Sequence, residues 1–219
     1  MAEQISSLQN NWFAEDTSVS DTLREAAIVR SRLLYDSSNY VFLVDLEHPK
    51  HGAGLGVYKP QRGERPLADF PHGTLYHREI AAYEYAQLLG WNNIPPTIEC
   101  SGPEGPGSIQ LFIEHDPSKH FFTLRDRNAL QEQFIRFAIF DILTNNADRK
   151  SGHLILDTHG QVWGIDNALC FNSEEKLRTV IWDFAGKRLP EHWLLDIQRV
   201  RDCLLNQEES AATFLACLF

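Results

Sequence analysis

A polar segment set between two apolar segments is the feature of this sequence that most restricts its fold. Residues 145–153 contain two Asn, an Asp, an Arg, a Lys and a His, with FIRFAIFDILT before them and LIL after them. A surface turn needs little more than a Gly or a Pro, and polar groups are rarely buried without partners. We therefore expect the polar segment to line a cleft, with the apolar segments packed behind it. The residues expected to be buried behind it are Ile142, Leu143, Leu154 and Leu156.

The first half of the chain has the pattern of a small antiparallel sheet with one helix. Runs of β-branched and aromatic residues, separated by turn-forming residues, indicate strands. A helix is indicated over residues 74–90 by a Thr that can cap its start, by its Ala and Leu content, and by a Gly at its end. The strands are expected at residues 27–35, 40–47 and 52–60, followed by a hairpin of residues 95–100 and 108–115.

The second half is expected to be mainly helical. Apolar residues at helical spacing predict a long helix over residues 127–144. A short hairpin, formed by residues 153–157 and 162–171, is expected after it. Residues 173–219 are expected to be mostly helical, with breaks at a Gly and a Pro.

This order of elements predicts an α+β protein with two lobes. Residues 1–20 are expected to form a loose polar arm. Residues 21–115 would form a β-rich N-lobe with one helix, and residues 116–219 a mostly helical C-lobe. The join between the lobes is expected near residues 114–117.

Five ionisable residues occur in an order that suits phosphoryl transfer from a nucleotide. Lys59 lies in the third strand, Glu79 lies early in the following helix, and Asp148 lies in the loop after the long helix. His153 follows five residues later, and Asp166 ends the second strand of the hairpin. Phosphoryl transfer requires a cation on the phosphates, carboxylates that orient that cation and receive the attacking hydroxyl, and metal ligands. Each residue alone is as well explained as a surface charge, a turn or a hydrogen-bonded histidine, but their order along the chain favours a nucleotide site.

Three motifs resemble those of phosphatidylinositol 3-/4-kinase-like proteins. The motifs are DILTNNADRKSGHLIL…VWGIDNALCF, GVYKP and HREIAAYEYAQLLG. From about residue 20 onward the chain looks like a group of small bacterial members of this superfamily, with HipA-like toxin kinases as more distant relatives. The resemblance implies a two-lobed protein-kinase-like fold of a minimal type. It also implies an ATP-dependent phosphotransferase that acts on a hydroxyl group and uses ATP with Mg²⁺ or Mn²⁺.

The resemblance implies a role for each candidate residue. Lys59 would hold the phosphates, Glu79 would orient Lys59, and Asp148 would be the catalytic base. Asp166 and His153 would bind the metal. The residues expected to cover the phosphates are Ser37, Ser38 and Asn39, and those expected beside the adenine are Phe112, Ile113 and Glu114.

The sequence departs from the family pattern at His153, where the family usually has Asn. Mg²⁺ prefers oxygen ligands, whereas imidazole suits softer metals. This departure leaves a second hypothesis open, in which the chain is a nucleotide-binding pseudokinase with a regulatory or interaction role. The acceptor is left open among a protein, a lipid and a small molecule.

Charge and composition argue against several other classes of protein. The formal net charge of -10 disfavours binding to nucleic acid or to an anionic membrane. No apolar stretch approaches the roughly 18 residues that span a bilayer, and the first residues lack the pattern of a signal peptide. The four widely spaced cysteines are expected to be reduced thiols. We therefore expect a cytoplasmic protein whose partners are a nucleotide and a hydroxyl-bearing substrate, with no nucleic acid and no integral membrane contact.

Overall fold

A computed structural model of the chain describes residues 10–34 and 39–219. Ser37 and Ser38, which were expected to cover the phosphates, lie outside the described residues. Their role therefore stays a prediction.

The chain divides into two units. Unit 1 contains the residues up to His77 together with Pro95–Ile113, and unit 2 contains Arg78–Ile94 and Glu114–Phe219. The boundary between residues 113 and 114 lies beside the expected join. The boundary between residues 77 and 78 differs from the expected lobes, because the helix that was counted with the first lobe belongs to unit 2 from Arg78 onward.

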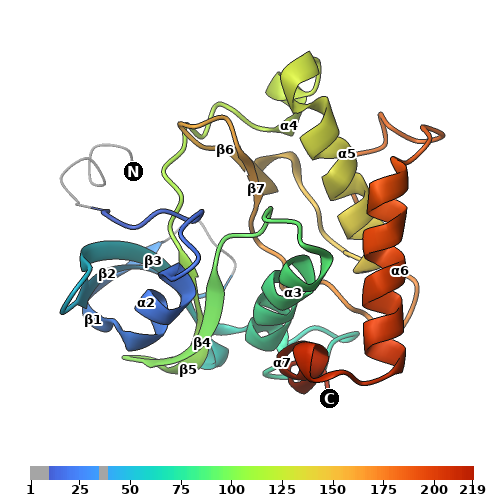
Figure 1. The fold of residues 1–219 in the computed structure, drawn as a ribbon. Coiled ribbons are helices and arrows are strands. Elements are labelled where there is room, and N and C mark those ends of the chain that lie inside the picture. The colour runs from blue at the N-terminus through green and yellow to red at the C-terminus, as the bar shows by residue number, and fades with distance from the viewer. Residues whose placement is uncertain (1–9, 35–38) are drawn as a thin grey trace. The chain divides into compact units, whose positions relative to one another are not determined.

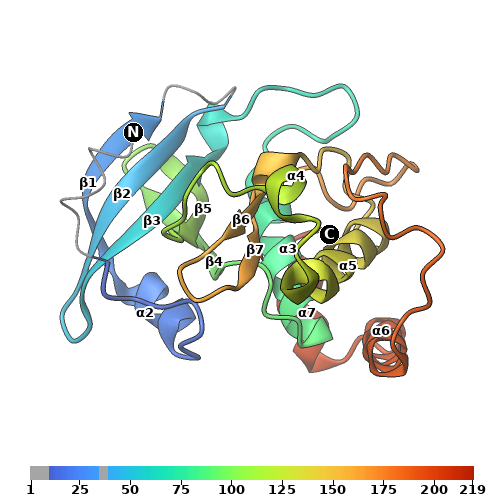
Figure 2. The ribbon, with the colours of Figure 1, turned by 90° about the horizontal axis from the view of Figure 1, so that it is seen from above.

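Unit 1 is built on a five-stranded antiparallel sheet with the strand order β1-β2-β3-β5-β4 (Figures 1 and 2). Val44 and Leu46 of the second strand are almost fully buried and belong to the core of unit 1. All five predicted strands are present, and the last ends at residue 111 rather than at residue 115. The strands are β1 (Ala27–Leu34), β2 (Val41–His48), β3 (Gly52–Pro60), β4 (Thr97–Gly102) and β5 (Gly105–Leu111).

The expectation of a loose arm over residues 1–20 is wrong for its described part. Trp12 is 6% exposed and belongs to the core of unit 1, and its Nε1 donates to the backbone oxygen of His51 at 3.0 Å. The Trp12 ring lies against Gly54, where an added Cβ would come within 2.3 Å of it. The chain then forms helix α2 (Val19–Glu25), with Val19 in the same core. The apolar residues Trp12 and Val19 within an otherwise polar stretch were the feature of the sequence that could have predicted this packing.

Unit 2 is mainly helical and contains one short hairpin. Helices α3 and α5 pack their apolar residues into one core, and Arg136 of α5 lies over the Trp193 ring of α6, at 5.1 Å from the ring centroid. The two long predicted helices and the hairpin are confirmed, but the second strand of the hairpin ends at residue 164 rather than at residue 171, so Asp166 lies in the loop after it. The elements are α3 (Leu75–Leu89), which begins in unit 1, α4 (Phe121–Leu124), α5 (Asn128–Leu143), β6 (Leu154–Leu156), β7 (Val162–Gly164), α6 (Glu191–Leu205) and α7 (Ala212–Ala216). Short 3₁₀ turns are η1 (Gln61–Gly63), η2 (Ser151–His153) and η3 (Glu209–Ala211).

The expectation that residues 173–219 are mostly helical is wrong for their first part. Residues 165–190, all of which are described, contain no helix, and α6 begins directly after Pro190. The reason lies in the backbone hydrogen bonds. The N–H of Lys176 donates to the side chain of Asn145, and the N–H of Arg178 donates to the backbone oxygen of Asn146. These donors are therefore taken by the polar segment and are not available to a helix.

Two further expectations concern the membrane and the cysteines. Within the described part of the chain, no helix has both the length and the apolar character that crossing a membrane requires. All four cysteines are free thiols.

Replacing Trp12 by Ala should lower the free energy of unfolding by about 3–5 kcal/mol, because it leaves a cavity against the sheet of unit 1. Phe13→Ala is the matched control. Phe13 is 58% exposed, so its truncation should cost less than about 1 kcal/mol. Urea denaturation followed by far-UV circular dichroism measures both. Equal midpoints for the two variants would show that residues 10–20 are a loose arm after all.

Candidate active site

A buried carboxylate on the apolar face of α5 is the centre of the candidate site. Leu130, Phe134 and Phe137 follow one another at helical spacing, and Asp141 occupies the next position of this stripe. Asp141 is 0% exposed. An ionised carboxylate is stable in such surroundings only when it is paired and hydrogen-bonded. The sequence of α5 therefore requires a partner for Asp141 from elsewhere in unit 2.

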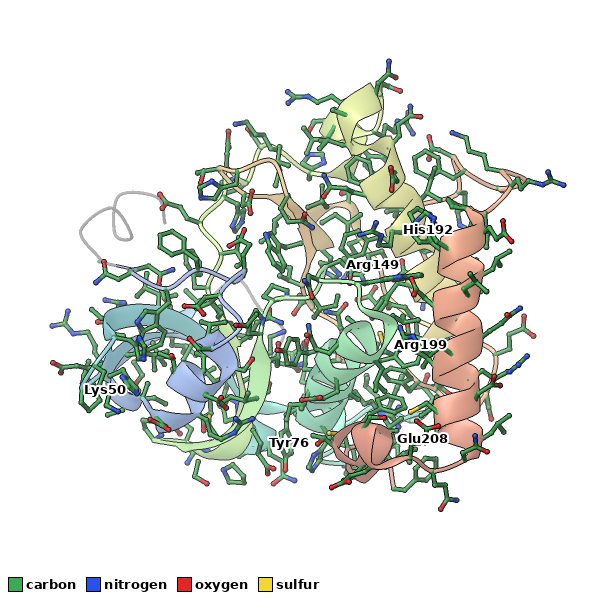
Figure 3. The ribbon with its side chains drawn as sticks, viewed as in Figure 1. Lys50, Tyr76, Arg149, His192, Arg199 and Glu208 are labelled. Carbon is green, nitrogen blue, oxygen red and sulfur yellow. The ribbon has the colours of Figure 1, made fainter. Side chains whose placement is uncertain are left out.

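Arg149, at the interior position of unit 2 that Figure 3 labels, is that partner, and its side chain is also 0% exposed. Its Nε donates to the two carboxylate oxygens of Asp141 at 3.0 and 3.2 Å, and its Nη2 lies 2.9 Å from Oδ1. Its remaining donors reach the backbone oxygen of Ile165 at 3.0 Å and Oδ1 of Asn167 at 2.8 Å. Burial lowers the pKa of Arg149, but the Asp141 carboxylate opposes this, and the net change is upward. The Arg149 guanidinium is therefore charged where it contacts Asp141.

The Asp141 carboxylate also orders the polar segment. Asn146 donates from Nδ2 to Asp141 Oδ1 at 2.9 Å, and its Oδ1 accepts the backbone N–H of Asp148 at 3.0 Å. Thr179 donates from Oγ1 to Asp141 Oδ2 at 2.8 Å. One buried carboxylate thus connects the polar segment to a stretch about thirty residues further on.

Residues 172–179 are attached to the polar segment by backbone and side-chain hydrogen bonds. The N–H of Arg178 donates to the backbone oxygen of Asn146 at 2.8 Å, and its carbonyl accepts the N–H of Arg149 at 2.9 Å. Asn145, which has a left-handed backbone with φ of 48°, donates to two carbonyl oxygens of this stretch and accepts one of its N–H groups. The two Asn residues of the motif therefore hold this stretch in place.

Asp148 stands on this frame with a partly exposed carboxylate. Its side chain is 36% exposed, so the expectation that solvent reaches it is confirmed. Lys150 places Nζ 2.8 Å from Asp148 Oδ2. Lys150 was not selected from the sequence, although its position two residues after the candidate base was a usable signal. The loop thus presents a carboxylate and an ammonium group side by side.

The packing behind Asp148 agrees only in part with the expectation that four apolar residues are buried there. Leu154 is buried, and Leu143 and Leu156 are half-buried. Ile142 was expected to be buried, but it is 59% exposed. The reason is that the core-facing position at this turn of α5 is occupied by the neighbouring Asp141, which turns the next side chain toward solvent.

His153 and Asp166 lie together, with Nε2 and Oδ2 3.4 Å apart. Burial of the imidazole lowers the pKa of His153 to about 4, although the Asp166 carboxylate acts in the opposite direction. The ring is therefore neutral near pH 7. A neutral imidazole nitrogen and a carboxylate oxygen are both ligands that Mn²⁺ accepts.

These two ligands suit a metal that phosphate groups also hold. Mg²⁺ and Mn²⁺ in nucleotide sites commonly bind one or two protein side chains together with substrate phosphates. Among the residues that the structure describes, no group of three or more His, Cys, Asp or Glu side chains is arranged to hold a metal by itself. His153 and Asp166 therefore fit a metal that arrives with a nucleotide.

The backbone at Asp166 is strained and is held by α3. Asp166 has φ of 58°, in a left-handed region that costs a residue other than Gly of the order of 1–3 kcal/mol. Glu79 is 1% exposed, and its Oε2 accepts the N–H of Asn167 at 3.0 Å. Arg149 holds the Asn167 side chain from the other side. Glu79, Arg149 and the candidate metal ligand Asp166 thus belong to one connected arrangement in unit 2.

Two further candidates, Lys59 and Asn39, lie in unit 1. Lys59 is half-buried in β3 and faces Ser108 of β5 in the strand register. It lies in a different unit from Glu79, so their ion pair stays a prediction. Asn39 accepts the N–H of Arg65 through Oδ1 at 3.0 Å.

The stretch expected beside the adenine crosses the boundary between the units. Phe112 and Ile113 end unit 1 and are half-buried, whereas Glu114 begins unit 2 and is exposed. The N–H of Phe112 donates to Leu55 and its carbonyl accepts from Asn10. The backbone groups of Phe112 are thus already engaged within unit 1, and contact with adenine stays a prediction.

Comparison with known proteins places the chain in a family. The sequence profile described as phosphatidylinositol 3- and 4-kinase matches residues 76–198, which is more than half of the chain. The protein Rv2133c of Mycobacterium tuberculosis is 38% identical over a match that covers 68% of this chain and 65% of that protein. The chain therefore spans slightly less than two thirds of the length of this relative.

Similar solved structures include two proteins of low sequence identity. The Helicobacter pylori proinflammatory kinase CtkA matches with a TM-score of 0.50 and 12% identity, over 87% of this chain and 89% of that one. A hydra Fam20 structure with sugar matches with a TM-score of 0.47 and 17% identity, over 95% of this chain and 93% of that one.

The fold and the arrangement of unit 2 define an α+β protein with a protein-kinase-like fold, as the sequence predicted. The chain belongs to the phosphatidylinositol 3- and 4-kinase family.

Replacing Arg149 by Met should lower the free energy of unfolding by about 3–5 kcal/mol, because Asp141 would be left as an unpaired buried charge. Arg201→Met is the control. Arg201 is paired with Asp202 on the surface, with side chains 62% and 56% exposed, so its loss should cost less than about 1 kcal/mol. The double variant Asp141→Leu, Arg149→Met should recover part of the loss, because no lone charge remains. Urea denaturation tests all three, and a parent-like midpoint for Arg149→Met would contradict the role of the pair.

Lowering the pH should destabilise the metal-free protein through His153. The pKa of His153 is about 4 in the folded protein and about 6.5 in an unfolded chain. Below pH 6.5 the unfolded state therefore binds a proton that the folded state does not. The resulting loss of stability accumulates between pH 6.5 and 4, with a slope of up to about 1.4 kcal/mol per pH unit. Urea denaturation across this range measures it.

His153→Asn should remove this part of the pH dependence. His159→Asn, at an exposed position, is the control and should leave the His153 contribution in place. An identical fall in stability for the parent and His153→Asn would show that burial does not suppress protonation of this ring.

Proposed function

We propose that this chain is an ATP-dependent phosphotransferase that transfers the γ-phosphoryl group of ATP to a hydroxyl group. The observation that supports this proposal best is the position of Asp148. Its carboxylate is partly exposed, while the Asp141 and Arg149 side chains that fix its loop are fully buried. A general base must come within about 2.6–3.2 Å of the proton that it takes, so its loop has to be held still.

In this proposal Asp148 accepts the proton of the acceptor hydroxyl. The hydroxyl oxygen forms a bond to the γ-phosphorus, and the bond from the γ-phosphorus to the β–γ bridging oxygen breaks. ADP then leaves. Lys150, with Nζ 2.8 Å from Asp148, supplies a cation where negative charge on the transferred group has to be stabilised.

The other roles follow from the chemistry of the residues. Lys59 would hold the phosphates and Glu79 would orient it. Asp166 and His153 would hold Mg²⁺ or Mn²⁺, which when bound supplies positive charge to the phosphate oxygens. The residues proposed to cover the phosphates are Ser37, Ser38 and Asn39, and those proposed beside the adenine are Phe112, Ile113 and Glu114.

The acceptor is a hydroxyl group of a protein, a lipid or a small molecule. Two probes distinguish the first two: a mixture of Ser-containing peptides, and vesicles that contain phosphatidylinositol. Label transferred from [γ-³²P]ATP to one of them, and not to the other, assigns the acceptor class.

A nucleotide-binding pseudokinase is the second candidate, and His153 is the observation that favours it. Where the resemblance implies an Asn, this chain has a largely buried, neutral imidazole, which suits Mg²⁺ less well than Mn²⁺. Both candidates bind a nucleotide with metal, but only the phosphotransferase releases ADP.

Replacing Asp148 by Asn should reduce ADP release by about 10²–10⁴-fold, because the amide keeps the shape of the side chain and does not accept the proton. Binding of Mn²⁺–ATP should persist. Asp126→Asn, at an exposed position outside the site, is the control and should behave as the parent does. ADP release from Mn²⁺–ATP, with water, the peptides or the vesicles as acceptor, measures the effect.

Two other outcomes of the ADP-release measurement would change the assignment. Turnover of Asp148→Asn at the parent rate would exclude Asp148 as the base. A parent that binds Mn²⁺–ATP but releases no ADP with any of these acceptors would support the pseudokinase.

A further inference from the structure

The loop that carries Asp166 is bracketed by two residues with left-handed backbone. Residues 165–171 contain no helix or strand. Asp166 and Phe171 have φ of 58° and 60°. Such conformations are uncommon for residues with bulky side chains, and they persist where the surrounding structure over-determines them. Whatever holds the two ends of this loop therefore sets the position of the Asp166 carboxylate.

Two consecutive residues of α3 hold the two ends. Glu79 accepts the N–H of Asn167 near the start of the loop. Arg78 donates from Nη1 to the carbonyl oxygens of Cys170 and Phe171 at its end, at 2.8 and 2.6 Å. The Arg78 guanidinium is half-buried, and burial lowers its pKa. Because water screens such a group less than an exposed one, its hydrogen bonds to these carbonyls are strong.

Arg78 bonds backbone groups of the loop that the other contacts do not reach. Arg149 reaches the carbonyl oxygen of Ile165, and the N–H of Ala147 reaches that of Leu169. These contacts hold the start and the middle of the loop, and at its end the N–H of Phe171 donates to the backbone oxygen of Thr144. The last two carbonyls, including the one at the strained Phe171, are bonded by Arg78.

We propose that Arg78 is a positioning residue for the metal-binding half of the site, acting through the loop of residues 165–171 on the carboxylate of Asp166. This inference rests on the proposed function, in which Asp166 and His153 hold a divalent metal. Without the two hydrogen bonds, the left-handed backbone at Phe171 keeps the bond from its N–H to Thr144 but loses the donor to its own carbonyl oxygen and to that of Cys170. The loop then samples several conformations, and fewer molecules have both ligands in place at once.

A titration with Mn²⁺ at a constant, saturating ADP concentration tests the proposal. Free Mn²⁺ is followed by electron paramagnetic resonance. Arg78→Met keeps the aliphatic stem and removes the donors, and its Mn²⁺ affinity should fall by about 10–100-fold, as for other residues that orient metal ligands. Arg78→Lys should lie between Arg78→Met and the parent, because an ammonium group can reach the carbonyls but lacks the fixed geometry of the guanidinium.

Arg199→Met is the matched control. Arg199, which Figure 3 shows on α6, also donates from Nη1 to a carbonyl oxygen of α3, that of Leu88, at 2.8 Å. This contact is made at the far end of α3 from Arg78. Arg199→Met should therefore lose a comparable hydrogen bond and keep the Mn²⁺ affinity of the parent.

Hydrogen–deuterium exchange of the metal-free protein gives a second readout. The amides of residues 167–171 should exchange faster in Arg78→Met and Arg78→Lys than in the parent, and at the parent rate in Arg199→Met. If Arg78→Met does not fold, the comparison of Arg78→Lys with the parent decides, in both measurements.

The outcomes separate the two proposals. If the parent binds Mn²⁺ with ADP and the Arg78 variants bind it as tightly, the role of Arg78 is overturned and the proposed function is not. The same holds if the parent binds Mn²⁺ with ADP and Arg199→Met is impaired as much as Arg78→Met. A parent that binds no Mn²⁺ with ADP overturns the proposed function, and the role of Arg78 with it.

Discussion

The interaction on which the rest of unit 2 depends is the buried ion pair of Asp141 and Arg149. Neither side chain reaches solvent, so each must find all its partners within the protein. Asp141 takes them from Arg149, Asn146 and Thr179, and Arg149 takes them from Asp141, Ile165 and Asn167. Satisfying this one pair therefore fixes the polar segment, the start of the loop that carries Asp166, and the stretch that ends at Thr179.

The same arrangement separates the groups that give rigidity from the groups available for chemistry. Arg149 and Asp141 are fully buried, whereas Asp148 and Asp166 on the adjoining loops are 36% and 53% exposed. A site of this kind needs side chains that meet a ligand on a support that does not move. His153 lies between these extremes, at 12% exposed, and its burial keeps the imidazole neutral and able to act as a ligand.

The family assignment and the proposed chemistry rest mainly on the same part of the chain. The family profile matches residues 76–198, which include most of α3, the polar segment and the Asp166 loop, but not Lys59. Unit 2 likewise contains α3 from Arg78 onward, with Glu79 bonded to the loop after Asp166. The carboxylate expected to orient the phosphate-binding lysine is therefore built into the unit that carries the candidate base and metal ligands.

The sequence by itself determined the strands of unit 1, the helices α3 and α5, the family and the set of polar residues around Asp148. Runs of β-branched and aromatic residues, helical apolar spacing and a motif with fixed spacing are local properties. Only the tertiary structure decided what depends on distant contacts. Trp12 is core because Gly54 leaves room for its ring, and residues 173–179 are not helical because Asn145 and Asn146 take their backbone groups. The role of Asp141 was not predicted from the sequence, because it depends on Arg149, eight residues further on, which folds back and bonds the Asp141 carboxylate.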